Sequence, residues 1–505
     1  MMIMFILFAG AAALELLVHV ASKFSGVRTG LATLSLAVTA GATAAALALH
    51  FNLFTVLLAL LAGYRILNML RVIEKRMHDR YLKNATRSTT FTLLGLQSAV
   101  GLGWLAWSNW HTTGHATWAI LGLLQLAASG VFLYSVLRTL RRTAWPTEHG
   151  SYSDAELPSV TVAIPARNET EDLQQCLQSI IASDYPKLEV IVLDDCSQTK
   201  RTPEIIREFA HDGVRFIQGH QPDETWLPKN EAYARLAQEA SGAYVLFCGV
   251  DIRFSQSSIR TLVSTMLDRK KQMVSILPRR RQEAYGQVSL VQAMRYWWEL
   301  VPPRRAFQRP PVLSSCWIID REVLKKRGGF ASVARAIVPE AYFARQLTAN
   351  DAYSFLRSDG VGIESIKSVN DQRSTAIRMR YPQMHRRPEQ IAITTLWELL
   401  FLVMPFVLAV GGFWLPIGTV AHLAAALASL MLIGAYEATV LSTRVNSWWF
   451  GIIGQPLAAL SDVVLLHYSM WKYEFSTVDW KGRNVCVPVM HVTPHLPPVD
   501  GKPNK

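Results

Sequence analysis

Residues 160–199 read VTVAIPARNETEDLQQCLQSIIASDYPKLEVIVLDDCSQT. This stretch holds two continuous apolar runs, at 160–164 and 188–193, on either side of a segment whose apolar residues recur at helical spacing. Short apolar runs bounded by polar residues are typical of buried strands, and a helix between two of them is typical of a parallel sheet. The stretch therefore predicts an α/β domain whose sheet is mostly parallel.

The same alternation continues along the chain. Helices are expected near 203–210 and 230–240, and strands near 214–218 and 243–248. Acidic residues follow the second and fourth strands, with Asp194 and Asp195 after one and Asp251 after the other. Because open parallel sheets bind ligands beyond the carboxyl ends of their strands, we expect these carboxylates to face one cleft.

A cleft of this kind suits a nucleotide with a divalent cation, since carboxylate oxygens are hard ligands for Mg²⁺ or Mn²⁺. The loop after the first strand has neither a GxGxxG nor a GxxxxGK[ST] pattern, which argues against a dinucleotide-binding fold and against a P-loop kinase. An Asp at a strand end can also cap the next helix, and for Asp194 we weigh capping and binding equally.

Apolar blocks flank this domain in a chain of 505 residues that is 50% hydrophobic. A membrane-spanning helix needs about 20 such residues. We expect spanning helices near 2–21, 30–49, 53–70, 89–107, 117–137, 391–410 and 413–440. The run 448–466 is expected to be interfacial or re-entrant, because a crossing there would place Lys472, Lys481 and Arg483 outside. Glu15 and Arg65 fall inside predicted spans, and we favour charges near helix ends that reach for the interface over a functional role for either residue.

Loop charge gives the orientation and the domain scheme. Lys and Arg follow the first, third and fifth spans, whereas the loops 50–52 and 108–116 hold none. Positive loops stay in the cytoplasm, so the α/β domain is expected there. The scheme is an N-terminal transmembrane region of about five helices at 1–142, a cytoplasmic α/β domain at 146–388, transmembrane or interfacial helices at 389–470, and a cytoplasmic tail at 471–505.

The net charge of +13 fits a membrane surface better than a nucleic acid. No aromatic RNA-binding signature or recognition-helix pattern accompanies the basic residues, so no nucleic-acid partner is expected. The five cysteines show no CxxC spacing, which indicates neither a zinc site nor a disulfide framework.

Several motifs in this order resemble the inverting family 2 glycosyltransferases with a GT-A fold. They are TVAIPARNET, IVLDDCSQT, LPKNEAYARLAQEASGAYVLFCGVDIRF, RGGF, PEAYFAR and a late VDWKGR. Within that family the chain is similar to the ceramide glucosyltransferase branch and its bacterial relatives that glycosylate hopanoids and other lipids. The resemblance covers about 158–388 and extends to Trp480–Arg483. It implies a GT-A-like (Rossmann-like) soluble domain inserted between transmembrane helices, in an integral protein of a bacterial inner membrane.

Carried over residue by residue, the resemblance implies a site for a UDP-sugar donor. Pro165 and Glu169 would border the uracil pocket, Asp195 would hold the base or ribose, and Lys229 would lie by the nucleotide. Asp251 would bind the Mg²⁺ or Mn²⁺ that bridges the diphosphate, although Gly249 stands where the family has the first Asp of Asp-x-Asp.

Two further positions depart from the family pattern. The catalytic base of the family is an Asp where this chain has Ala341, which leaves Glu340 as the best remaining base. Arg380–Tyr381 replaces the Arg-Trp pair of the membrane-proximal gate, where Arg380 would neutralise phosphate and Tyr381 would stack at the acceptor site. An equally weighted alternative is that these residues simply face anionic lipid.

The leading hypothesis is a membrane-bound inverting glycosyltransferase that transfers a sugar from a UDP-sugar to a lipid acceptor. Two alternatives stay open at this point. One is a polysaccharide synthase, although the QxxRW motif is missing. The other is an inactive glycosyltransferase-like scaffold that organises partner enzymes of the same pathway, because Gly249 and Ala341 both depart from the family pattern.

Overall fold

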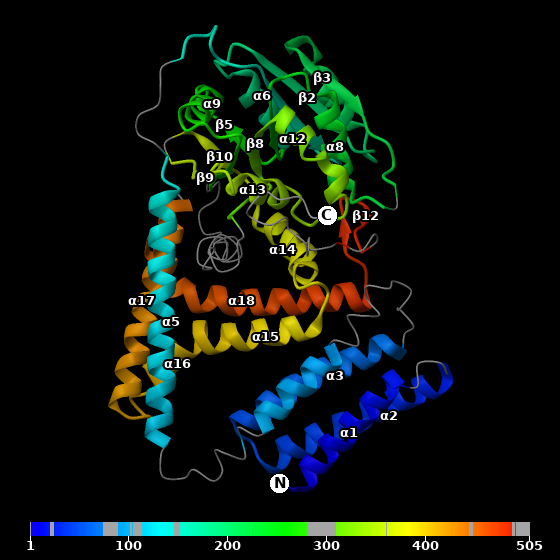
Figure 1. Cartoon of the computed structure of the whole chain (residues 1–505), viewed down its shortest axis with the longest axis vertical. Coiled ribbons are helices and arrows are strands. Elements are labelled where there is room, and N and C mark those ends of the chain that lie inside the picture. Colours follow the sequence, from blue (N-terminus) through cyan, green and yellow to red (C-terminus); the bar gives the residue numbers. More distant parts are fainter. Residues whose placement is uncertain are drawn as a thin grey trace. The chain divides into compact units, whose positions relative to one another are not determined.

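The computed structural model divides the chain into two compact units (Figure 1). One unit holds Met1–Leu126, Arg380–Leu427 and Val463–Ser476, and the other holds Ala127–Met379, Ala428–Asp462 and Thr477–Lys505. The structure describes residues 2–20, 25–73, 89–101, 104, 114–145, 152–223, 225–280, 310–359, 361–443, 448–486 and 490.

The second unit contains the predicted α/β domain, built on a seven-stranded sheet of order β3-β2-β1-β4-β8-β6-β9. The strands β3, β2, β1 and β4 run parallel, as predicted, and β6 is parallel to β9. Only β8 is antiparallel, and it lies between β4 and β6. The bounds are β1 Val160–Ala166, β2 Leu188–Asp194, β3 Val214–Gln218, β4 Tyr244–Cys248, β6 Met273–Leu277, β8 Cys316–Asp320 and β9 Tyr353–Arg357.

Helices and short strands complete this domain. The helices are α6 Glu171–Ile181, α7 Arg201–Glu208, α8 Pro228–Glu239, α9 Ser258–Asp268, α12 Arg321–Lys326, α13 Glu340–Thr348 and α14 Val369–Gln383, with short 3₁₀ turns at Ala210–Asp212 and Gly329–Val333. A second sheet of order β5-β10-β7 is formed by Ile252–Phe254, Ile363–Ser365 and Arg279–Arg280, and β11 Asp479–Trp480 pairs with β12 Arg483–Asn484 as a hairpin.

Alternate residues of each central strand fill two apolar layers, because successive side chains point to opposite faces of a sheet. Val162 and Ile164 of β1 belong to the same buried cluster as Leu173 and Leu177 of α6. Phe247 of β4 stacks on Trp317 of β8, with 4.5 Å between their ring centroids. Burying both faces explains why these strands read as continuous apolar runs rather than as alternating ones.

Long apolar helices form the rest of the described chain. They are α1 Met2–Val20, α2 Ser25–Leu49, α3 Leu53–Ile73, a helical segment at 89–101, α5 Gly114–Arg142, α15 Pro388–Glu398, a π turn at Leu399–Val403, α16 Met404–Gly411, α17 Thr419–Thr443 and α18 Trp448–Phe475. Five stretches of them are long and apolar enough to cross a membrane, namely Thr29–Leu49, Leu53–Ile73, Thr117–Arg142, Pro388–Gly411 and Thr419–Thr443.

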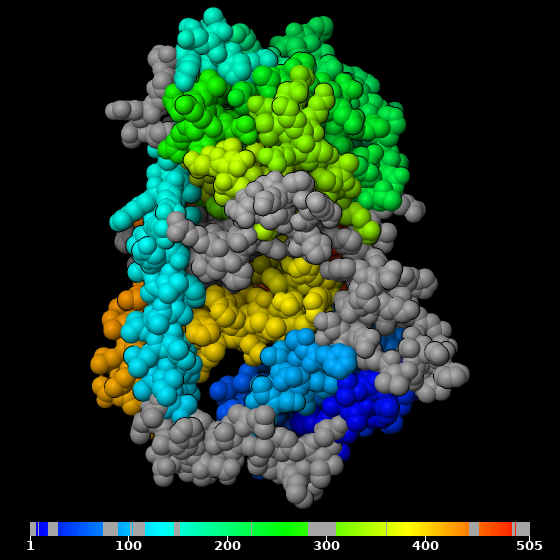
Figure 2. Space-filling model, in the orientation of Figure 1, coloured from blue at the N-terminus to red at the C-terminus, as the bar shows by residue number. Residues whose placement is uncertain are grey.

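Large apolar side chains on these helices are exposed, as expected of a surface that faces lipid tails. The helix α5, cyan in Figure 2, shows this along its length. Its exposed residues include Ile120, Leu123, Leu124, Val131 and Tyr134.

A buried ion pair joins α1 to α3 in the first unit. The Arg65 guanidinium donates from Nε to Glu15 Oε1 at 2.9 Å, and its Nη2 lies 2.7 Å from the same oxygen. Ser35 of α2 also donates to Glu15, and Arg65 donates to Gln97. The exposed fractions of Arg65 and Glu15 are 0% and 1%. The expectation that these charges reach for the membrane interface is therefore wrong, since they neutralise each other inside the helix bundle.

Replacing Arg65 by methionine should destabilise the protein by about 3–5 kcal/mol, because it leaves the Glu15 carboxylate buried without its cation. We expect a lower thermal midpoint for the full-length protein in detergent, and a large recovery in the double variant Glu15→Gln/Arg65→Met. Arg141→Met, which removes an exposed arginine at the end of α5, is the matched control. Equal midpoints for the single and double variants would contradict a coupled pair.

Candidate functional site

The polar loops that follow β1 and β2 are joined at the carboxyl edge of the sheet. The backbone N–H of Asp195 donates to the carbonyl of Ala166 at 2.8 Å, and the N–H of Asn168 donates to Ser197 Oγ at 2.9 Å. Asp194 Oδ1 accepts from both the N–H and the hydroxyl of Ser197. Asp194 is thus used to close its own turn, whereas Asp195 points its carboxylate elsewhere.

Asp195 and Glu169 each meet a cation from the C-terminal hairpin. Arg483 Nη1 donates to Asp195 Oδ2 at 2.5 Å, and Lys481 Nζ donates to Glu169 Oε1. The two carboxylate side chains are only 9% and 12% exposed. Burial raises the pKa of both carboxyl groups, and the neighbouring cations oppose that rise. The sequence places Asp195 and Glu169 correctly at one edge, but it does not reveal which residues cover them.

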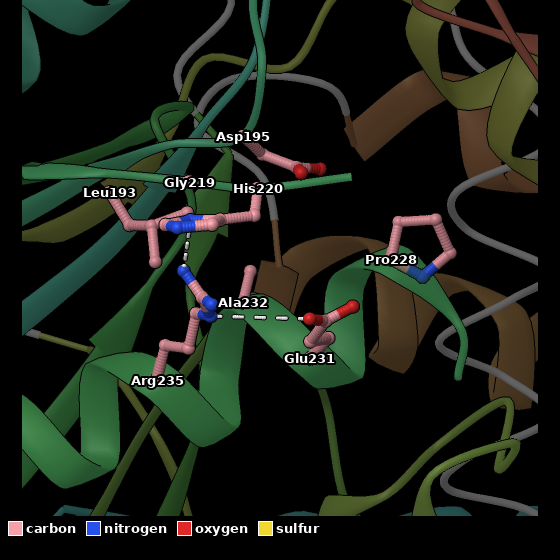
Figure 3. A pocket seen from close by; sticks show the side chains of 8 residues that line it. All are labelled: Leu193, Asp195, Gly219, His220, Pro228, Glu231, Ala232 and Arg235. Carbon is pink, nitrogen blue, oxygen red and sulfur yellow. Dashed lines mark hydrogen bonds and ion pairs between the residues drawn. The ribbon is translucent and has the colours of Figure 1, made fainter. Parts of the chain in front are cut away.

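A small pocket opens beside Asp195 between the ends of β2 and β3 and the start of α8 (Figure 3). Within it Arg235 lies between two partners: its Nη1 is 2.6 Å from His220 Nδ1, and its Nε is 4.0 Å from Glu231 Oε1. The pocket is lined by Leu193, Asp195, Gly219, His220, Pro228, Glu231, Ala232 and Arg235. Of this lining only Asp195 was predicted, because polar residues on a helix face carry no sequence signal for a pocket.

Lys229 lies in the first turn of α8, which begins at Pro228. Its ammonium is 5.0 Å from the ring centroid of Tyr233, one turn further along the helix. Pro165, the other residue that the resemblance placed at the donor, is half-buried within β1. Pro165 therefore lies near the carboxyl end of β1, and Lys229 lies at the start of α8.

Asp251 follows β4 and folds back over Gly249. A Cβ atom built on Gly249 would lie 2.5 Å from Asp251 Oδ1, so the carboxylate fills the space where a side chain at position 249 would begin. Asp251 Oδ2 accepts from the Ser365 hydroxyl at 3.1 Å, and the Asp251 carbonyl accepts from the N–H of Ile366. Burial is the main cause of the raised pKa of Glu169, and the Asp251 charge adds a small contribution in the same direction.

The described residues contain no cluster of three or more His, Cys, Asp or Glu side chains placed to hold a metal ion. Asp251 alone is the carboxylate at the expected position. Because Mg²⁺ is often held by one or two carboxylates together with substrate phosphates, Asp251 suits a cation whose remaining ligands come from a diphosphate and water.

Glu340 begins α13 and is fully buried. Among the described residues neither of its carboxylate oxygens has a hydrogen-bond partner. It lies near the buried Tyr233, whose phenol pKa is raised mainly by burial and also by the Glu340 charge. A buried carboxylate without hydrogen bonds is costly, and such groups are often found at functional sites.

Arg380 and Tyr381 belong to the other unit. Arg380 Nη2 lies 3.6 Å from Glu398 Oε1, and the Glu398 side chain is fully buried. Tyr381 is also fully buried, and its hydroxyl donates to the carbonyl of Arg386 at 3.1 Å. Its ring packs 6.0 Å from that of Tyr473, so in this conformation it offers no exposed face for stacking.

Part of the α/β domain is similar to known proteins. Residues 161–328 match the model described as glycosyl transferase family 2. Among curated relatives, the glycosyltransferase AglE of Haloferax volcanii is 33% identical over 114 residues, which is 22% of this chain and 36% of AglE. The probable glycosyltransferase YdaM of Bacillus subtilis is 30% identical over 120 residues, which is 23% of this chain and 28% of YdaM. The chain thus spans about a third of the length of these relatives.

Solved structures give more distant likenesses. The mannosyltransferase PcManGT from Pyrobaculum calidifontis, in complex with GDP-Man and Mn²⁺, is 19% identical with a TM-score of 0.44, over 70% of this chain and 99% of PcManGT. TarS 1–349 of S. aureus, in complex with UDP-GlcNAc, is 16% identical with a TM-score of 0.30, over 62% of this chain and 91% of that one.

Proposed function

We propose that this chain, whose residues 161–328 match glycosyl transferase family 2, is a membrane-bound inverting glycosyltransferase that transfers a sugar from a nucleotide-sugar to a lipid hydroxyl. The observation that carries the proposal is the placement of Glu169, Asp195 and Asp251 after β1, β2 and β4 of one parallel sheet. That edge is where open α/β sheets bind nucleotides.

In this proposal the donor is a UDP-sugar, with UDP-glucose or UDP-N-acetylglucosamine as the first to test. Asp195 accepts hydrogen bonds from N–H groups of the base or from ribose hydroxyls, which requires that Arg483 first release it. Pro165 and Glu169 border the base, and Lys229 lies on the diphosphate side at the start of α8.

The reaction creates negative charge on the departing nucleoside diphosphate. A Mg²⁺ or Mn²⁺ ion on Asp251 would stabilise this leaving group by several kcal/mol. Asp251 is held for that role by Ser365, which donates to Oδ2 and leaves Oδ1 directed over Gly249.

The acceptor hydroxyl must lose a proton as it attacks the anomeric carbon, and Glu340 is the proposed base. Neither oxygen of its carboxylate has a hydrogen-bond partner among the described residues, so both are available to accept a hydrogen bond from the acceptor hydroxyl. Because Glu340 is fully buried, this role requires a local shift at the start of α13.

The proposed acceptor is a lipid, because five helical stretches in the described part of the chain are long and apolar enough to span a membrane. By the distribution of basic loops, the α/β domain would lie on the cytoplasmic side of a bacterial inner membrane. Arg380 would neutralise phosphate charge on the acceptor side. Tyr381 is buried beside Tyr473, so it would help to position the residues around Arg380.

A second candidate is an inactive scaffold that binds a nucleotide-sugar or partner enzymes of its pathway. Gly249 and Ala341 favour it, because they remove one metal ligand and the usual base from the family pattern. It differs from the transferase in one measurable way, since it binds donor without forming product.

Purified full-length protein in lipid vesicles should release UDP from a UDP-sugar only when Mg²⁺ or Mn²⁺ is present, and excess EDTA should abolish the release. The reason is that Asp251 and the leaving diphosphate are both negatively charged, so a divalent cation between them would be needed to stabilise the departing group. Coupled detection of UDP, together with radiolabelled sugar in the lipid phase, measures both halves of the reaction. Donor binding by calorimetry without any product would favour the scaffold, and turnover that ignores EDTA would contradict the metal role.

A further inference from the structure

The C-terminal hairpin lies on the loops of the candidate donor site, although the family match ends at residue 328. Its strands β11 and β12 pair through Asp479–Asn484 and Trp480–Arg483, and its turn is Lys481–Gly482. Both turn residues have a positive φ, of 49° and 77°. This conformation directs Lys481 and Arg483 toward separate acidic residues, one on each side of the turn.

The hairpin is fitted closely to the two loops beneath it. Arg167 Nε and Asn168 Nδ2 donate to the Lys481 carbonyl at 3.0 and 2.9 Å. A Cβ atom on Gly482 would lie 2.5 Å from the Gln198 side chain, so only glycine suits both the backbone conformation and the close approach. On its other side the Arg378 guanidinium lies 4.8 Å from the centroid of the Trp480 ring.

The two cations of the turn cover the carboxylates that the donor needs. Arg483 donates to Asp195, and its second nitrogen reaches the Asp195 carbonyl at 3.3 Å and Gln221 at 3.4 Å. Lys481 covers Glu169, which also interacts with Asp251. Arg483 therefore occupies Oδ2 of Asp195, and a nucleotide that uses this oxygen must displace it.

The charges at this edge indicate which groups Lys481 and Arg483 contact when a nucleotide is bound. Glu169, Asp195 and Asp251 bring three negative charges to one edge, and a nucleoside diphosphate adds at least two more. Gly249 supplies no carboxylate for a metal, and the described residues hold no three-ligand metal cluster. Arginine and lysine are the usual protein cations for phosphate, and arginine binds it in a bidentate manner.

We infer that the hairpin completes the donor site, with Lys481 and Arg483 passing from Glu169 and Asp195 to the diphosphate when the nucleotide binds. The exchange frees Asp195 for the nucleoside and places two positive charges on the leaving group. This inference rests on the proposed function, and it gives the VDWKGR motif a role in donor binding, although the motif lies outside the matched residues 161–328.

The test is the affinity of the full-length protein for UDP and for uridine, measured by calorimetry. Lys481→Gln and Arg483→Gln should each weaken UDP binding by about 10- to 100-fold, because each removes a charge-assisted hydrogen bond to phosphate. Uridine, which has no phosphate, should bind as well as before or more tightly. Lys481→Arg and Arg483→Lys should retain most of the UDP affinity.

One further variant tests the conformation of the turn, and another is the control for folding. Gly482→Ala keeps both cations but disturbs the turn, so it should also weaken UDP binding. Arg215→Gln removes an exposed ion pair on β3 and should leave both affinities unchanged. Tighter binding of UDP by the charge variants would mean that the hairpin only blocks the site, and this would overturn the inference. Unchanged binding of UDP would overturn it as well. If wild-type protein binds neither UDP nor GDP, the proposed function fails together with it.

Discussion

Replacing Asp251 by asparagine should lower sugar transfer by about 10²- to 10³-fold, because the variant loses the carboxylate that is proposed to hold the divalent cation. Asparagine keeps the size of the side chain and can still accept a hydrogen bond from Ser365. The loop after β4 should therefore keep its shape. Initial rates of transfer at saturating donor, measured over a range of Mn²⁺ concentrations, are the readout.

The response to metal separates a chemical role of Asp251 from a structural one. In the variant, transfer should need far more Mn²⁺, whereas UDP binding in EDTA should change little. Asp212→Asn, an exposed acid in the turn before β3, is the matched control. Full activity with an unchanged metal requirement would remove Asp251 from the mechanism.

The second large effect is expected at Glu340. Glu340→Gln should reduce transfer by about 10²- to 10⁴-fold, the usual contribution of a general base. Donor affinity should stay the same, because Glu340 acts on the acceptor hydroxyl. Rates of transfer to lipid and the Kd for UDP, measured on one preparation, give this comparison.

Thermal stability provides the check on folding for this variant. Glu340 is fully buried, and its carboxylate has no hydrogen bond within the described residues. A neutral isostere removes the cost of burying a charge, so the midpoint of unfolding should stay equal or rise. Glu322→Gln, on the surface of α12, is the control. Unchanged turnover in Glu340→Gln would exclude Glu340 as the base.

The parallel half of the sheet is predictable because its strands carry a strong local signal. The apolar runs 160–164 and 188–193 became β1 and β2, and the polar residues after them lie at the same edge. The position of β8 between β4 and β6 is not predictable in this way, since strand order depends on contacts that no local pattern records.

Long-range contacts also explain what the sequence does not reveal about the charges. The pair between Asp195 and Arg483 joins residues 288 positions apart. Likewise Arg65 and Glu15 look like two isolated charges in apolar helices, but they form one buried pair because α1 and α3 both pack against α2. Tyr381 is expected from the sequence to stack at the acceptor site or to face lipid, yet it is fully buried beside Tyr473.

The account depends on a nucleotide-sugar binding at the carboxyl edge of the parallel sheet. Photoaffinity labelling of the full-length protein with an azido-uridine analogue of a UDP-sugar, followed by peptide mapping, tests this directly. We predict labelling of the peptides that contain Asp195 and Lys229, and complete protection by excess UDP. The account would be contradicted by the absence of label that UDP competes for, or by competed label confined to peptides from other parts of the chain.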